Sequence, residues 1–125
     1  MANLILIILG AILTMVWGVA HLFATKGVVK DFGEISKDNK NIIIMEWIIE
    51  GITLIFIGVL VILVSLIDSG MSTSSQWVYL SCSILLFGLT ILSLFTGARV
   101  NFIVFKLCPV IFTLSGVLIL VGIYI

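Results

Sequence analysis

The stretch IIIMEWIIEGITLIFIGVLVILVSLI, residues 42–67, decides the fold of this chain. Its only ionisable side chains are Glu46 and Glu50, and both lie near its beginning. A helix rises about 1.5 Å per residue, so this stretch is long enough to cross a hydrocarbon layer about 30 Å thick. Three more apolar stretches predict three more spans, at about 3–24, 76–96 and 102–125. We therefore predict an all-α integral membrane protein, a four-transmembrane-helix bundle that forms the single domain 1–125.

The composition supports the same class. Of the 125 residues, 62% are hydrophobic, where soluble proteins have about 45–50%, and 10% are charged, where about 25% is usual. The mean hydropathy is +1.44. Too few charged residues exist to cover the surface of a soluble globule. The six Lys and Arg residues balance six Asp and Glu residues, so no basic cluster predicts a nucleic-acid partner.

The basic residues predict the orientation of the bundle. All of them fall in the first and third connections: Lys26, Lys30, Lys37, Lys40, Arg99 and Lys106. With four spans, these two connections lie on the same side of the membrane. The positive-inside rule makes that side cytoplasmic, so both termini are expected to be non-cytoplasmic. We expect a prokaryotic cytoplasmic (inner) membrane.

The first connection has helical spacing of its own. Val28, Val29, Phe32 and Ile35 recur on one side, with charged residues on the other. This pattern predicts a short interfacial helix at about 27–36, and the alternative is a solvated loop. The second span would then be capped by Asn39 or Asn41.

Ionisable residues inside the apolar stretches are the most informative. His21 lies about one turn from the cytoplasmic end of the first span, and Glu46 and Glu50 lie about one and two turns into the second. Charged groups at such depth normally face protein or water, and they often mark a site. The small residues Gly10, Thr14 and Gly18 share a helix face with His21 and favour close packing, so this face is expected to meet the Glu46–Glu50 face.

This pattern predicts a polar pocket on the cytoplasmic side. Its candidate ligand-binding residues are Trp17, His21, Glu46, Trp47, Glu50, Arg99 and Lys106, with Arg99 and Lys106 as alternative cations. His21 and Glu50 are the candidates for acid–base catalysis. In the competing interpretation, Glu46 extends to the interface and Glu50 only holds the bundle together.

We expect no cofactor and no metal, because the chain has a single His and lacks the repeated carboxylate and His elements of a di-iron bundle. Cys82 and Cys108 lie at different depths, so we expect no disulfide and interpret both as packing residues. The start of the fourth helix stays open. If it begins near Leu107, Pro109 lies in its first turn, and if it begins near Phe102, Pro109 lies inside it beside a buried Lys106.

The segment GVAHLF, Gly18 to Phe23, together with the four-span layout, resembles the broad DoxX-like group of small bacterial membrane proteins. That resemblance implies a four-helix bundle, and some members of the group are linked to oxidoreductase complexes. The small multidrug exporters also have four spans, but they carry their essential Glu in the first span, where this chain has no acid.

From these features we expect a membrane protein that binds a lipid or another amphipathic small molecule in the cytoplasm-side pocket, either alone or as an accessory subunit. The alternatives are a membrane enzyme that uses His21 and Glu50, and a proton-coupled transporter that acts as an oligomer. The expected partners are membrane lipid, a small amphipathic ligand and either further copies of the chain or a larger membrane complex.

Overall fold

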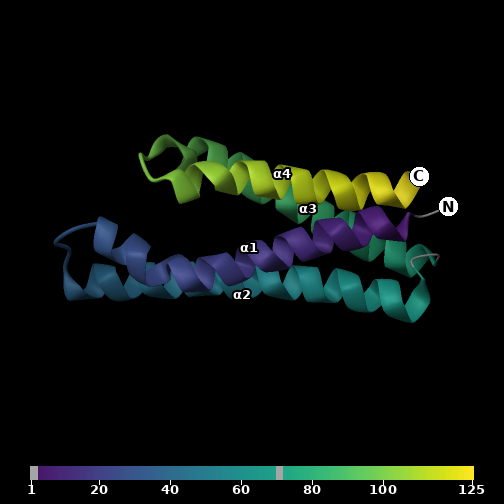
Figure 1. Cartoon of the computed structure of the whole chain (residues 1–125), viewed down its shortest axis with the longest axis horizontal. Helices are drawn as coiled ribbons and strands as arrows, with labels where there is room; N and C mark the ends of the chain where they lie inside the picture. The colour runs from purple at the N-terminus through teal and green to yellow at the C-terminus, as the bar shows by residue number, and fades with distance from the viewer. Residues whose placement is uncertain (1–2, 70–71) are drawn as a thin grey trace.

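The chain is described by a computed structural model that covers residues 3–69 and 72–125, and in these ranges all regular structure is helical. Figure 1 shows four long helices side by side, with both termini at the same end. The elements are α1 (Leu4–Asp31), α2 (Lys37–Asp68), α3 (Thr73–Phe95), the short 3₁₀ helix η1 (Gly97–Arg99) and α4 (Ile103–Tyr124). Each of α1 to α4 is long and apolar enough to cross a membrane. The predicted all-α bundle of four membrane-length helices is confirmed.

The first connection differs from the prediction. Instead of forming a separate helix at about 27–36, the chain continues α1 without a break to Asp31, because Val28 and Val29 stay buried on the same helix face. Gly33 then adopts a φ of +73°, a left-handed conformation that ends helices. The predicted caps Asn39 and Asn41 are also wrong, since α2 starts after Ser36, whose hydroxyl accepts the Asn39 N–H at 3.2 Å.

The fourth helix begins at the earlier of the two predicted positions. Its N-cap is Phe102, so Pro109 lies inside the helix and buried. Proline has no N–H, so it cannot donate the usual bond to the Phe105 carbonyl. Lys106, however, is exposed rather than buried beside the acidic residues.

Close helix contacts hold α1 against α2 and α4. A Cβ added to Gly18 would lie 2.6 Å from the Gly51 carbonyl oxygen, and one added to Gly58 would lie 2.6 Å from the Ala11 carbonyl oxygen. One added to Gly10 would lie 2.8 Å from the Ser115 carbonyl oxygen of α4. The predicted small-residue face of α1 is therefore a packing face.

The α2–α3 contact is confined largely to one end of the bundle. There the Tyr79 hydroxyl lies 2.9 Å from Ser65 Oγ, close to the turn that joins the two helices. Figure 1 shows the α3–α4 pair separating from the α1–α2 pair toward the opposite end. We name the end with both termini the terminal end and the other, which carries the α1–α2 and α3–α4 connections, the basic end.

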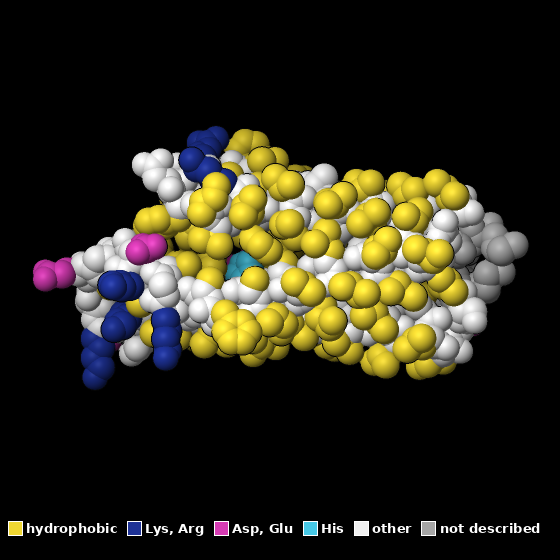
Figure 2. Space-filling model, viewed as in Figure 1, with side chains coloured by type: hydrophobic (Ala, Val, Ile, Leu, Met, Phe, Trp, Pro, Cys, Tyr) yellow, Lys and Arg dark blue, Asp and Glu magenta, His cyan; other side chains and the backbone are white. Residues whose placement is uncertain are grey.

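Charge follows the same division. All six Lys and Arg residues lie at the basic end, and on the face in Figure 2 the charged side chains gather there while apolar side chains cover most of the surface between the two ends. Asp68 is the one acidic residue at the terminal end. The uneven distribution of charge along the sequence is thus a division between two ends of the folded bundle.

Candidate functional site

His21 is the centre of the polar cluster at the basic half of the bundle. It lies on the packing face of α1, and only 2% of its surface is exposed. Its Nδ1 lies 3.0 Å from the carbonyl oxygen of Trp17, one turn earlier in the helix. A carbonyl oxygen can only accept, so Nδ1 carries a proton and donates it to this bond. The bond fixes the ring and leaves Nε2 as the atom that faces the other helices.

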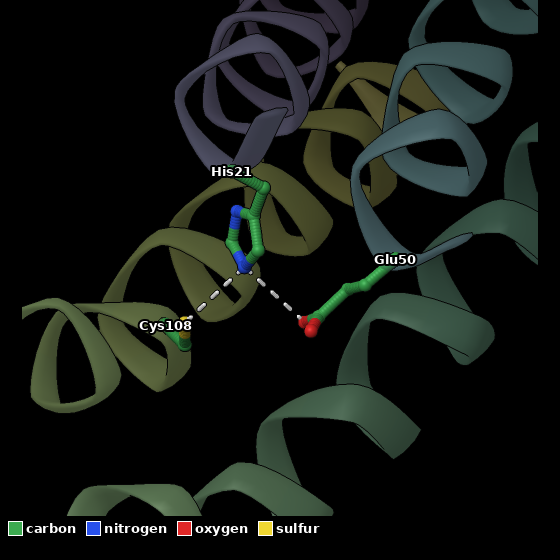
Figure 3. Close-up of side chains that lie close together, drawn as sticks. All are labelled: His21, Glu50 and Cys108. Atoms are coloured by element: carbon green, nitrogen blue, oxygen red, sulfur yellow. Dashed lines mark hydrogen bonds and ion pairs between the residues drawn. The ribbon is translucent and has the colours of Figure 1, made fainter. Parts of the chain in front are cut away.

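Two side chains from other helices approach this nitrogen. Glu50 Oε1 of α2 lies 3.5 Å from His21 Nε2, and Cys108 Sγ of α4 lies 3.9 Å from it. Figure 3 shows the three side chains converging from separate helices. The predicted encounter of the His21 face with the Glu50 face is therefore present, and Cys108 is an addition that we had interpreted as a packing residue. Within residues 3–69 and 72–125, Glu50 is the only carboxylate within ion-pair distance of a basic side chain, and this contact is an ion pair when His21 Nε2 carries a proton.

Aromatic rings enclose the cluster. The Trp47 ring stacks on the His21 ring with centroids 4.7 Å apart, and the Trp17 ring meets it edge-on at 5.6 Å. The Phe105 ring of α4 also lies against the Trp47 ring, with centroids 4.9 Å apart. These rings make the surroundings of Nε2 largely apolar.

The indole N–H groups of Trp17 and Trp47 are buried and make no hydrogen bond to any described residue. Buried donors are rarely left without an acceptor, so these two indoles are exceptional among the polar groups beside His21. The side-chain hydroxyls of Ser83 and Ser115 are likewise buried and make no hydrogen bond to any described residue.

A cavity of about 690 Å³ opens beside the cluster, where α2 and α3 have separated. Glu50, Trp47 and Cys108 are part of its wall, so the polar cluster lies at the cavity's edge. Most of the remaining wall is apolar. Other residues of the wall are Glu46, Thr53, Leu54, Leu89, Leu92 and Phe105.

The predicted cations do not join this site. The Arg99 guanidinium lies 5.7 Å from the centre of the Phe95 ring, and both Arg99 and Lys106 are exposed and outside the cavity wall. The side of α4 that faces the cavity instead presents Phe105 and Cys108. Glu46 lines the cavity, but it is exposed and forms no ion pair with a described residue. Of the seven predicted residues, the structure thus brings together Trp17, His21, Trp47 and Glu50, with Glu46 nearby.

A second and larger cavity, about 900 Å³, lies between the end of α1 and the beginning of α2. It contains none of the predicted site residues. Lys26, Lys30 and Lys40 line it together with Glu34 and several aliphatic side chains. Its lysines could contact an anionic group, so any binding experiment must distinguish the two cavities.

Sequence reasoning missed Cys108 because the start of the fourth helix was open. Starting it at Phe102 would have placed Cys108 about two turns deep, level with Glu50. Both cysteines are free, as predicted.

Comparisons with protein-family models, with curated proteins and with solved structures find no match to this chain. Its function must therefore be argued from the geometry of this cluster and cavity.

Proposed function

We propose that the protein binds a lipid or another amphipathic small molecule in the 690 Å³ cavity between α2, α3 and α4. The observation that carries this proposal is the cavity's two-part wall. Leu54, Leu89 and Leu92 form an apolar part, and Glu46, Glu50 and Thr53 form a polar part. A molecule with an apolar chain and a polar group satisfies both parts.

The size of the cavity fits a ligand of this kind. Small-molecule sites are mostly apolar cavities of about 300–1,000 Å³ with a few polar groups that fix orientation. The polar group of the ligand would donate to the carboxylate of Glu50 or Glu46, while its chain would lie along the leucines. The chain of a membrane lipid already lies in an apolar medium, so its preference for the cavity comes from close packing against the helices and from the polar contacts.

The proposed orientation puts this cavity on the cytoplasmic side. It lies in the half of the bundle that carries all six Lys and Arg residues, and the positive-inside rule assigns that end to the cytoplasm. Both termini would then be outside. We further propose a prokaryotic cytoplasmic membrane and, through the DoxX-like resemblance, a role as an accessory subunit that presents its ligand to a larger complex.

The test is thermal unfolding in detergent with added phosphatidylethanolamine, phosphatidylglycerol or a free fatty acid. A ligand selective for the folded state stabilises it by RT ln(1 + [L]/Kd). We expect at least one of the three to raise the melting temperature of the native chain. Thr53→Phe places a ring in the cavity and should abolish that increase. The matched control is Ile52→Phe at the preceding residue, which should preserve the increase because Ile52 lies outside the cavity wall.

Two results would contradict the proposal. One is the absence of any shift with all three compounds. The other is a shift that survives Thr53→Phe but disappears when Lys26 and Lys30 are changed to Ser, which would assign binding to the larger cavity.

Acid–base catalysis by His21 and Glu50 is the second candidate, favoured by their 3.5 Å contact. Since Nδ1 is occupied by the Trp17 carbonyl, Nε2 would exchange the proton and Glu50 would stabilise the charged ring. In an enzyme, His21→Ala should abolish turnover of a bound molecule while leaving its binding measurable. Loss of binding without any detectable turnover in the native chain would favour the binding protein.

A further inference from the structure

The geometry points to a binding site for a divalent transition-metal ion, with Zn²⁺ as the fitting ion, formed by His21 Nε2, Glu50 and Cys108 Sγ. This inference goes beyond the proposed function, since the cluster is complete whether or not the cavity holds an amphipathic molecule. It also replaces the expectation of no metal site, which rested on a single His and took no account of the Cys108 thiol.

The ligand atoms have the right types and spacing. The three residues offer one nitrogen, one sulfur and one carboxylate oxygen, and these atoms all lie within 4.8 Å of one another. Zinc bonds of about 2.1 Å to N and O and about 2.3 Å to S place tetrahedral ligand atoms about 3.4–3.6 Å apart. The observed 3.5 Å from His21 Nε2 to Glu50 Oε1 already matches, and the 3.9 Å to Cys108 Sγ is only slightly longer. Small side-chain movements would close the site around an ion.

The hydrogen bond of His21 prepares Nε2 for this role. Metal-binding histidines usually donate their other ring N–H to a carbonyl or carboxylate, which fixes the tautomer and the ring's direction. Here the Trp17 carbonyl receives the Nδ1 proton at 3.0 Å, and Trp47 stacks on the ring. The neutral ring therefore presents the Nε2 lone pair toward the other two ligands.

The charges of the cluster also match a divalent ion. A Cys108 thiolate and a Glu50 carboxylate together carry two negative charges, which one M²⁺ neutralises. Binding forms three bonds to the metal and releases to solvent the thiol proton, any proton on His21 Nε2, and waters of the hydrated ion. Neutrality matters because an uncompensated charge is costly in an apolar span. The mixed N, S and O set suits Zn²⁺ better than Mg²⁺ or Ca²⁺, which prefer oxygen ligands.

A fourth position can be supplied from the cavity. Glu50 and Cys108 both line it, so water, or a polar group of a bound molecule, can reach an ion held by the three residues. Three protein ligands with one exchangeable position are the arrangement of catalytic rather than purely structural zinc sites.

Cobalt titration tests this inference directly. Chelator-treated protein in detergent is titrated with Co²⁺, whose bond to a thiolate gives a charge-transfer absorption band in the near ultraviolet. We expect the band to saturate at one Co²⁺ per chain and to be displaced by Zn²⁺. Cys108→Ser should abolish it. Cys82→Ser is the matched control, because it removes the other buried cysteine, on α3, and should leave the band intact.

The two remaining ligands give smaller, graded effects. We expect Glu50→Gln and His21→Ala each to weaken Co²⁺ binding at least about tenfold, the scale at which even residues behind the ligands act. Absence of the band in the native chain, or its persistence in Cys108→Ser, would overturn the site.

A second measurement guards against loss of folding in the variants. In the Cys82→Ser protein, Cys108 is the only thiol, and Zn²⁺ should slow its reaction with a maleimide at least about tenfold. An unchanged rate with excess Zn²⁺ would also refute the site. Thr53→Phe leaves all three ligands in place, so it should retain the Co²⁺ band, which separates failure of lipid binding from failure of metal binding.

Discussion

The terminal end and the basic half of the bundle differ in how far their polar side chains are hydrogen-bonded. At the terminal end, Ser65 donates to the Val61 carbonyl at 2.8 Å, so the Tyr79 hydroxyl donates to Ser65 Oγ at 2.9 Å. Asp68 accepts from the hydroxyls of Ser72 and Ser75. In the basic half, two buried indole N–H groups have no acceptor among the described residues, and Glu50 is 35% exposed beside a cavity.

This difference distinguishes polar groups that stabilise the bundle from polar groups that can bind a ligand. Polar groups that satisfy one another join helices, and they leave nothing for a ligand to gain. Polar groups that converge without full satisfaction cost stability but provide binding energy. We therefore expect substitutions at the terminal end to reduce stability, and substitutions around His21 and Glu50 to change binding with little effect on stability.

Of the three changes in stability predicted here, the largest should come from Gly122→Ala at the terminal end. The new Cβ would lie 2.6 Å from Ile7 Cγ1 and 3.0 Å from the Asn3 carbonyl oxygen, so α1 and α4 must move apart. Overpacking of this kind costs about 1–3 kcal/mol. Gly88→Ala on α3 is the control, because nothing lies within 4 Å of its added Cβ, and the better helix former should stabilise by about 0.5–1 kcal/mol. Equilibrium unfolding in mixed micelles measures both, and equal effects would refute the comparison.

Tyr79→Phe should have the next largest effect. It removes the donor to Ser65 while keeping the buried ring, and a neutral hydrogen bond contributes about 1 kcal/mol. The same unfolding measurement should show a loss of that size, and none for Tyr124→Phe, since Tyr124 is 73% exposed. A loss for Tyr124→Phe as large as that for Tyr79→Phe would show that the α2–α3 hydrogen bond contributes nothing specific.

Glu50→Gln should have the smallest effect on stability, about 1 kcal/mol or less, because its ion pair with His21 is partly exposed to solvent. Its effect on Co²⁺ binding should nevertheless exceed that of Glu46→Gln, whose carboxylate lies outside the three-residue cluster. Strong destabilisation by Glu50→Gln would mean that the pair is a structural contact like that of Ser65 and Tyr79.

The sequence was sufficient to predict the helices and part of the site. The lengths of the apolar stretches predicted four membrane-length helices, and the periodicity of α1 and α2 predicted that His21 would meet Glu50. Arg99 was misplaced because sequence position gives its depth but not its direction, and its guanidinium lies over Phe95 instead. The interfacial helix was wrong because the same apolar spacing also fits a continuation of α1, which ends at Asp31, just before the left-handed Gly33.

Hydrophobicity and charge along the chain thus determined the number of helices and the segregation of charge, because both depend on local composition and spacing. Only the tertiary structure decided that α2 and α3 separate toward the basic end and that Cys108 reaches His21. Those features depend on which helix faces meet. Close contacts at Gly18, Gly58 and Gly10 fix α1 against its two neighbours, and no single stretch of sequence contains both sides of such a contact.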